Sequence, residues 1–143
     1  MPALRETFAY RLRSAKKVIS TSIRQNFRDT GISRDTFIVL RTIYENPGLT
    51  QREIGESCCK DANVIVKLID RLEDMGFVRR VRGERDRRTF TIFATDTGAK
   101  AAEDFWSHYV EQVEESLNVL TEREKEELSR MLDKILNYYE SAV

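Results

Sequence analysis

The residues best suited to binding a charged partner are six arginines that fall within ten positions. They are Arg79, Arg80, Arg82, Arg85, Arg87 and Arg88. With the two carboxylates among them, the segment 79–88 has a net charge of +4. The planar guanidinium of arginine forms paired hydrogen bonds with phosphate or guanine. The cluster therefore favours nucleic acid as the partner, although a charged hairpin tip can also serve only to prevent strand pairing between molecules.

The formal net charge of zero over 143 residues conceals a strong asymmetry. Residues 1–30 carry seven cations against two carboxylates, and residues 103–140 carry eleven carboxylates against four cations. Local fields decide where a polyanion docks, so the zero total does not argue against one. The basic N-terminal segment is more simply explained as a solvated helix face. The acidic segment is expected to lie away from a bound polyanion.

Catalysis and metal binding find little support in the sequence. There is one histidine, and no Ser-His-Asp, Cys-His, Walker or glycine-rich cofactor pattern is present. His108 is spaced with nearby carboxylates as on one helix face, but a single imidazole there more often forms a surface ion pair than a metal site. We expect neither an enzyme nor a bound metal or cofactor.

Membrane insertion and secretion are not expected either. The longest uninterrupted aliphatic and aromatic run covers only residues 37–40, and the first residues lack a hydrophobic signal region. The two cysteines, Cys58 and Cys59, are adjacent and cannot form a disulfide framework. The sequence thus predicts a soluble, cytoplasmic protein. A redox switch at these cysteines is one alternative, but adjacent cysteines rarely bridge without strain, and cysteine is a common small core residue.

The elements that position the arginines can be read from periodicity and capping signals. Residues 4 to about 28 form one continuous apolar stripe that predicts a long helix ended by Gly31. The stripe consists of Leu4, Phe8, Leu12, Ala15, Ile19, Ile23 and Phe27. A second helix begins after Ser33 and stops at residues 46–48. A capping box at 50–53 opens a short third helix, which runs to about Cys58.

A fourth helix follows a tight turn through Lys60. Asp61 is expected to cap this helix, and Gly76 to end it. Its buried face is expected to contain Ile65, Leu68, Ile69 and Leu72. The segments 77–81 and 89–94 are β-branched or aromatic runs joined by a polar loop, the pattern of a β-hairpin.

Two helices complete the chain. Thr95 opens one that carries an apolar stripe as far as Leu120, and a capping box at 121–124 opens the last. The order is four helices, a hairpin and two helices. This mainly α fold with a small β-hairpin wing is the winged helix-turn-helix plan over residues 33–94, in which the helix after the turn enters the major groove of DNA.

The candidate DNA-binding residues follow from that plan. On the fourth helix they are Asp61, Ala62, Asn63, Val66 and Lys67, and on the wing they are Arg82, Arg85, Arg87 and Arg88. Asn63 could pair with adenine and Val66 could contact a thymine methyl group. For Asp61, capping the helix is the simpler role. A wing arginine suits the narrow minor groove, whose negative potential attracts it.

Three segments carry a resemblance to a known family. The segment 70–80 (DRLEDMGFVRR), the Asp86-Arg87-Arg88 element and the segment 94–98 (ATDTG) together resemble the MarR family of bacterial transcription regulators. The resemblance covers essentially the whole chain, and the Asp-Arg-Arg element is its most specific part. It implies a single domain over 1–143, an obligate homodimer and a pseudo-palindromic operator. Most members repress, and many release DNA on binding a small phenolic or lipophilic acid or on cysteine oxidation.

The resemblance also assigns roles by position. It places Val64 beside Asn63 and Lys67 in the recognition helix, where many members have serine or threonine, so the operator sequence stays open. Arg71, farther along the same helix, is the last of the candidate DNA-binding residues. Asp86 is expected to brace the wing loop by pairing with a neighbouring arginine, while Arg85 or Arg88 reaches the DNA. The loop lacks the proline that is often present in the family.

The terminal helices independently predict a dimer. Their large apolar side chains exceed what one small lobe can bury, and closed two-fold pairing of segments 1–30 and 96–143 would cover them. On the last two helices they are Trp106, Tyr109, Met131, Tyr138 and Tyr139. Two functions remain: a homodimeric DNA-binding repressor released by a small effector, or a helical dimeric protein-interaction module whose wing no longer binds DNA. The arginine-rich wing favours the first.

Overall fold

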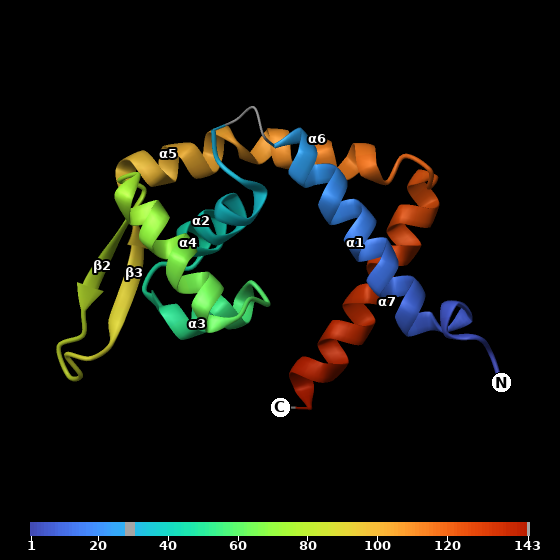
Figure 1. Ribbon diagram of the computed structural model, residues 1–143, viewed down its shortest axis with the longest axis horizontal. Coiled ribbons are helices and arrows are strands. Elements are labelled where there is room, and N and C mark those ends of the chain that lie inside the picture. The colour runs from blue at the N-terminus through green and yellow to red at the C-terminus, as the bar shows by residue number, and fades with distance from the viewer. Residues whose placement is uncertain (28–30, 143) are drawn as a thin grey trace.

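The computed structural model describes residues 1–27 and 31–142. Figure 1 shows a lobe formed by α2, α3, α4 and the hairpin, with α5 and α6 running past it to the terminal helices α1 and α7. The elements are η1 (Leu4–Glu6), α1 (Phe8–Asn26), α2 (Arg34–Glu45), β1 (Leu49–Thr50), α3 (Gln51–Ser57), α4 (Ala62–Asp74), β2 (Val78–Arg82), β3 (Phe90–Ala94), α5 (Asp96–Asp104), α6 (Trp106–Ser116) and α7 (Glu122–Ser141). The expected mainly helical fold with a small β-hairpin wing is confirmed.

The core of the lobe lies between α2, α3, α4 and the sheet. Its fully buried side chains include Phe37, Leu40, Ile43, Ile54, Ile65, Ile69, Leu72 and Ile92. The expected inner face of α4 is confirmed, with Leu68 half-buried beside it. The sheet has a third strand that the sequence does not reveal, because β1 is only two residues long. It pairs antiparallel with β3, placing Leu49 opposite Ile92 in the order β1-β3-β2.

The starts of α2, α3 and α7 agree with the capping signals. Ser33 Oγ accepts a hydrogen bond from the Thr36 amide at 3.1 Å. At α3, the Glu53 amide donates to the Thr50 hydroxyl at 3.2 Å, and the Thr50 amide donates to the Glu53 carboxylate at 2.7 Å. A second capping box, formed by residues 121 and 124, opens α7 in the same way. These bonds satisfy amides that would otherwise lack partners within their helices.

Two glycines join the end of α4 to the start of α5. Gly76 ends α4 with a φ of +75°, in the left-handed region that favours glycine. At Gly98, a β-carbon would lie 1.8 Å from the Phe77 carbonyl oxygen, so only glycine fits without displacing the backbone. The Thr95 amide donates to that same carbonyl at 3.0 Å. The base of the wing and the first turn of α5 are therefore in direct backbone contact.

The first helix is not continuous, contrary to expectation. After the short η1, Thr7 is extended, with φ −70° and ψ 146°, and its hydroxyl accepts from the Tyr10 amide at 3.3 Å. This side-chain bond begins α1 at Phe8, so a local cap overrides the apolar stripe. The expected helix end near residue 28 lies outside the described residues.

The helix expected from Thr95 to Leu120 is divided and shorter. It is interrupted at Phe105, although the Phe105 amide still bonds the Ala101 carbonyl at 3.1 Å, and the Tyr109 amide bonds the Phe105 carbonyl at 3.0 Å. It ends at Ser116, because the Leu117 amide bonds the Glu114 carbonyl and tightens the last turn.

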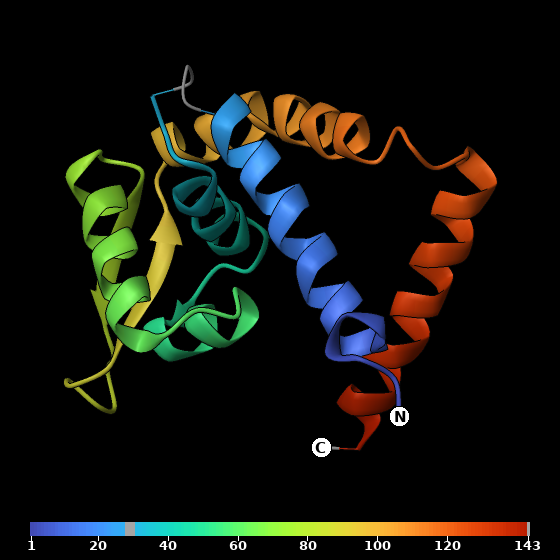
Figure 2. The same cartoon turned by 45° about the vertical axis from the view of Figure 1, so that its right-hand side comes forward.

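The terminal helices leave large apolar side chains uncovered. In Figure 2, α1 and α7 descend from the α5–α6 arm on the side away from the hairpin. α1 packs on α6, and the Phe27 ring meets those of Phe37 and Tyr109, with centroids 5.5 and 6.4 Å apart. α7 buries none of its residues. The exposed apolar residues of these two helices are Phe8, Leu12, Val18, Met131, Ile135, Leu136, Tyr138 and Tyr139. Within the described ranges, no helix is long and apolar enough to cross a membrane.

Candidate nucleic-acid interface

The first two turns of α4 present most of the expected reading residues to solvent. Ala62, Asn63, Val64 and Lys67 are exposed, and Val66 is half-buried. These residues are held outward because Ile65, Ile69 and Leu72 anchor the opposite face of the helix in the core. Their contact with DNA stays a prediction.

Asp61 does not have the expected capping role. It occupies the N-cap position of α4 with extended backbone, and its carbonyl accepts from the Ile65 amide at 3.0 Å. However, its side chain makes no capping hydrogen bond with the described residues. Its carboxylate is exposed at the tip of the recognition helix.

Asp86 braces the wing loop, but with partners other than the expected arginine. Its carboxylate accepts hydrogen bonds from the Arg88 amide at 2.9 Å and from the Thr89 hydroxyl at 3.2 Å. In addition, the Gly83 amide bonds the Thr89 carbonyl at 2.8 Å. Local backbone donors satisfy the carboxylate more readily than a flexible guanidinium, which must lose side-chain entropy to pair. The exposed side chains of Arg85 and Arg88 therefore remain available to a ligand.

The arginines of the wing fall into two groups. Arg79 and Arg82 lie over the rings of Phe93 and Phe90, with guanidinium carbons 4.9 and 5.2 Å from the ring centroids. These contacts hold two guanidinium groups along the strands. The loop arginines, including Arg87, extend from the tip of the hairpin.

Arg80 does not belong with the outward-facing cations of the cluster 79–88. It donates to Glu73 at 2.7 Å and to Asp70 at 2.5 Å, both on α4. Burial lowers the pKa of Arg80, but the two carboxylates raise it more, so the net shift is upward. Counting charges along the sequence misplaces Arg80, whereas the alternation of strand side chains places it on the same face as buried Val78.

Arg52 is a candidate that the sequence reasoning missed. It lies on the first turn of α3 with 88% of its side chain exposed and is paired with Glu56 at 3.1 Å. Together with Arg88 it lines a surface pocket of about 480 Å³ between the start of α3 and the loop end of β3. Two guanidinium groups at one pocket suit a phosphate oxygen. The sequence did contain a signal for this candidate. Arg52 stands two residues after Thr50, the N-cap of α3, and α3 is the first helix of the helix-turn-helix.

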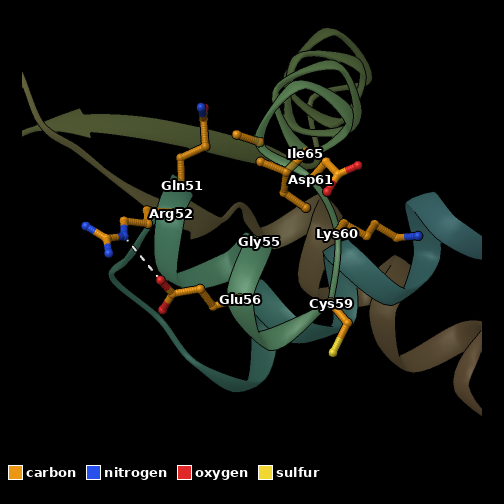
Figure 3. Close-up of a pocket in the computed structure, with 9 residues that line it drawn as sticks. Gln51, Arg52, Gly55, Glu56, Cys59, Lys60, Asp61 and Ile65 are labelled. Carbon is orange, nitrogen blue, oxygen red and sulfur yellow. Dashed lines mark hydrogen bonds and ion pairs between the residues drawn. The ribbon is translucent and has the colours of Figure 1, made fainter.

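A second pocket, of about 390 Å³, lies between α3 and the beginning of α4. Figure 3 shows the Arg52–Glu56 pair on one wall, and Asp61 and Ile65 on the α4 side. The pocket thus lies directly beside the exposed tip of α4.

Arg71 is not brought together with the other candidates. It lies in the third turn of α4 and lines a pocket of about 250 Å³ with Arg24, Phe27 and Ile32. This pocket is at the junction of α1, α2 and α4. The structure therefore places Arg71 near the terminal helices and not at the reading tip.

Asp35 joins three elements beside this junction. Its carboxylate contacts Arg34, Lys60 at 3.4 Å and Arg24 at 3.8 Å. Burial raises the pKa of Asp35, but the three cations lower it more. Because Lys60 lies in the turn just before Asp61, the N-cap of α4, and Arg24 is on α1, the cluster connects the first helix to the turn that leads into the recognition helix.

The cysteines differ in their surroundings. The Cys58 thiol is half-buried, packs against the core and donates to the Thr42 hydroxyl at 3.4 Å. Burial raises the pKa of Cys58, which lowers its thiolate fraction and its reactivity. Cys59 is exposed with a φ of +52°, and both thiols are free. The described geometry supports core packing for Cys58, and redox sensing stays untested.

His108 packs against an aromatic ring. Its ring centroid lies 5.1 Å from that of Phe27. Over the parts of the chain that the structure describes, no group of three metal-ligating side chains is found.

Comparisons with known proteins agree with the architecture. The model of the MarR family matches residues 32–90. The uncharacterised HTH-type transcriptional regulator YybA of Bacillus subtilis is 28% identical over 76% of this chain and 73% of its own length. The HTH-type transcriptional regulator BilQ of Clostridium symbiosum is 27% identical over 92% of each chain.

Solved structures show the same fold. BpsR of Bordetella bronchiseptica superposes with a TM-score of 0.81 at 18% identity, covering 94% of this chain and 96% of that one. MepR of S. aureus, solved in complex with DNA, gives 0.74 at 24% identity, covering 92% and 98%. A helix-turn-helix closed by a β-hairpin defines the winged helix-turn-helix class of transcription regulators. Within that class, residues 32–90 match the MarR family, and the chain as a whole is similar to the regulators named above.

Proposed function

We propose that the protein is a sequence-specific DNA-binding repressor that acts in the cytoplasm as a homodimer. The observation that carries this proposal is that the wing loop and the N-terminal end of α4 lie along the same edge of the lobe (Figures 1 and 2). One edge thus offers a slim helix tip and a cationic hairpin to neighbouring grooves of a duplex. The acidic α6 lies on the opposite side of the molecule from that edge, where its field opposes docking least. The acidic α7 does not follow the expectation, because it turns back and its C-terminal end lies on the same side of the molecule as the wing loop (Figures 1 and 2).

Each part of this edge has a role in the proposal. Asn63, Val64 and Val66 read base edges in the major groove, with Asp61 and Ala62 at the helix tip. Lys67 and Arg52 neutralise phosphates. Arg85 or Arg88 enters the minor groove, and Arg82 and Arg87 flank it. The exposure of all of these residues except the half-buried Val66 supports the assignment.

The terminal helices supply the dimer contact. The uncovered apolar side chains of α1 and α7 are a surface that a second copy of the chain would bury. The chain then acts as one domain, with its winged lobe carried by the dimerisation helices. Two lobes related by a two-fold axis fit a pseudo-palindromic operator.

The experiment that tests DNA binding starts with duplexes selected by the protein from fragments of its source genome. We expect the affinity for a selected fragment to fall steeply between two salt concentrations, with a slope of about −0.9 for each phosphate neutralised. Gel shift measures the affinity at each salt concentration. Transcription in vitro from the same fragment then distinguishes repression, the expected result, from activation.

The outcome that contradicts the proposal is also defined. A stable dimer that selects no duplex and shows no salt-dependent binding would support the alternative, a protein-interaction module with an unused wing. Sedimentation of the same sample gives the oligomeric state.

The pocket that Arg71 shares with Arg24, Phe27 and Ile32 is the proposed effector site. Two guanidinium groups beside apolar side chains suit a small aromatic or lipophilic acid. The DNA binding of BpsR is regulated by 6-hydroxynicotinic acid, and another protein of the same fold, from Mycobacterium tuberculosis, was solved with p-aminosalicylic acid. An anion here would compete with Asp35 for Arg24 and so disturb the cluster that contains Lys60.

We expect salicylate to bind and to release the selected DNA, and the Arg71→Ala variant to lose this response by about tenfold or more in ligand affinity. Calorimetry measures ligand binding, and gel shift measures release. Arg123→Ala, on α7, is the matched control and is expected to keep the response. Equal ligand affinity in the wild type and Arg71→Ala would exclude this pocket.

A further inference from the structure

Arg80 connects the wing to the recognition helix. Its two terminal nitrogens donate separately, at 2.7 Å to Glu73 Oε1 and at 2.5 Å to Asp70 Oδ1. These carboxylates are three residues apart on α4 and therefore share one face of it. Only 20% of the Arg80 side chain is exposed, so solvent screens these bonds less than it screens an ordinary surface ion pair.

The strand geometry keeps Arg80 away from a ligand at the wing tip. Side chains alternate along β2, which places Arg80 on the same face as buried Val78. Its cross-strand partner, Ile92, is fully buried. The guanidinium therefore faces α4, and it cannot reach a bound duplex while both bonds are formed.

The two strands of the wing are held differently, because β3 also pairs with β1, whereas β2 has no second strand beside it. β2 is an edge strand in the order β1-β3-β2, paired only with β3. Within the described ranges, the side-chain hydrogen bonds between β2 and α4 are those of Arg80. The position of Arg80 in the middle of β2 lets it fix the strand beyond its base at Val78.

We propose that Arg80 is a positioning residue that fastens the wing to the recognition helix, so that both meet DNA as one rigid body. This inference rests on the proposed function. Asp70 and Glu73 lie in the C-terminal half of α4, whereas the reading residues lie in its N-terminal half. Removal of the clamp therefore leaves the reading residues in place and changes only their geometry relative to the wing.

Arg80→Gln tests the clamp, with a duplex selected by the wild type from a random-sequence pool as the probe. We expect affinity for the selected duplex to fall about tenfold, and affinity for unselected duplex to stay within about twofold. The salt slope should match that of the wild type, because the number of phosphate contacts is unchanged. Gel shifts at several salt concentrations are made well below the melting temperature of each variant, so reduced stability alone would leave the specificity ratio unchanged.

Asp70→Asn gives a second test, because the clamp and simple electrostatics predict opposite changes in DNA affinity for this variant. This change removes a negative charge from the DNA-binding lobe, so simple electrostatics predicts tighter binding. The clamp predicts weaker binding to the selected duplex and the same slope. Arg80→Lys should restore function only in part, because one ammonium group does not reproduce the guanidinium fork.

Hydrogen exchange tests the clamp without DNA. In Arg80→Gln, the amides of Val81 and Thr91 should exchange faster than in the wild type, whereas those of α2 should not. If the wild type selects no duplex, the proposed function fails, and this exchange measurement alone decides the clamp. A salt slope reduced by about 0.9 in Arg80→Gln would mean direct phosphate contact and overturn the proposal. Unchanged wing exchange would overturn it as well.

Discussion

Arg88→Ala is expected to weaken binding to the selected operator by about tenfold or more, in line with the roughly 1–3 kcal/mol carried by a groove-inserted arginine. The Asp86 carboxylate fixes the Arg88 amide, so this side chain leaves the wing from a defined point. Loss of one cation at the duplex should also reduce the salt slope by about 0.9. Gel shift at several salt concentrations measures both effects, and sedimentation should show an intact dimer.

The controls for this prediction separate the DNA-facing edge from the rest of the surface. Lys67→Ala, on the exposed face of α4, should weaken binding in the same direction. Arg123→Ala removes another exposed cation, on α7, and should leave affinity unchanged. Wild-type affinity in both Arg88→Ala and Lys67→Ala would count decisively against DNA recognition by this edge.

Leu136→Glu is expected to convert the dimer to a monomer and to reduce operator affinity by about a hundredfold or more. Leu136 is 59% exposed on α7, within the apolar surface assigned to the partner chain. A carboxylate buried there without a partner costs several kcal/mol. A monomer can bind only one half-site, so the second lobe no longer contributes. Analytical ultracentrifugation and gel shift measure the two effects.

Ser129→Glu is the matched control for the dimer prediction. It places the same charge on the polar face of α7, beside Glu122, Lys125 and Asp133. We expect this variant to remain dimeric and to bind the operator as the wild type does. A Leu136→Glu protein that sediments as a dimer would show that α7 does not form the interface.

The parts of the fold that depend on short-range chemistry were predictable from the sequence. The caps at Ser33, Thr50 and Thr121 are satisfied by amides three residues away, so the local pattern is sufficient. The stop at Gly76 is equally local. By contrast, β1 is too short to show a period, and the break at Thr7 arises from one hydroxyl that competes with the apolar stripe.

The residues of the candidate site were predictable from the sequence, but the directions in which their side chains point were not. The arginine cluster correctly marks the wing, yet its members divide according to partners that lie far away in the sequence. Arg80 meets carboxylates on α4, and Arg79 and Arg82 lie over phenylalanine rings of β3. Asp86 bonds an amide and a hydroxyl in place of an arginine. Such choices depend on tertiary geometry and on the entropy lost by long side chains, which a linear count of charges does not contain.

The backbone contact at Gly98 bears on how two copies of the lobe could adjust to DNA. Because a β-carbon would lie 1.8 Å from the Phe77 carbonyl oxygen, the hairpin base and the first turn of α5 have no side-chain layer between them that could slide. Any tilt of the lobe is consequently transmitted to α5 undiminished. The first departure from regular helix along this path is at Phe105, between α5 and α6. Bending concentrated there would change the pitch at which two wings straddle a duplex while preserving the shape of each lobe.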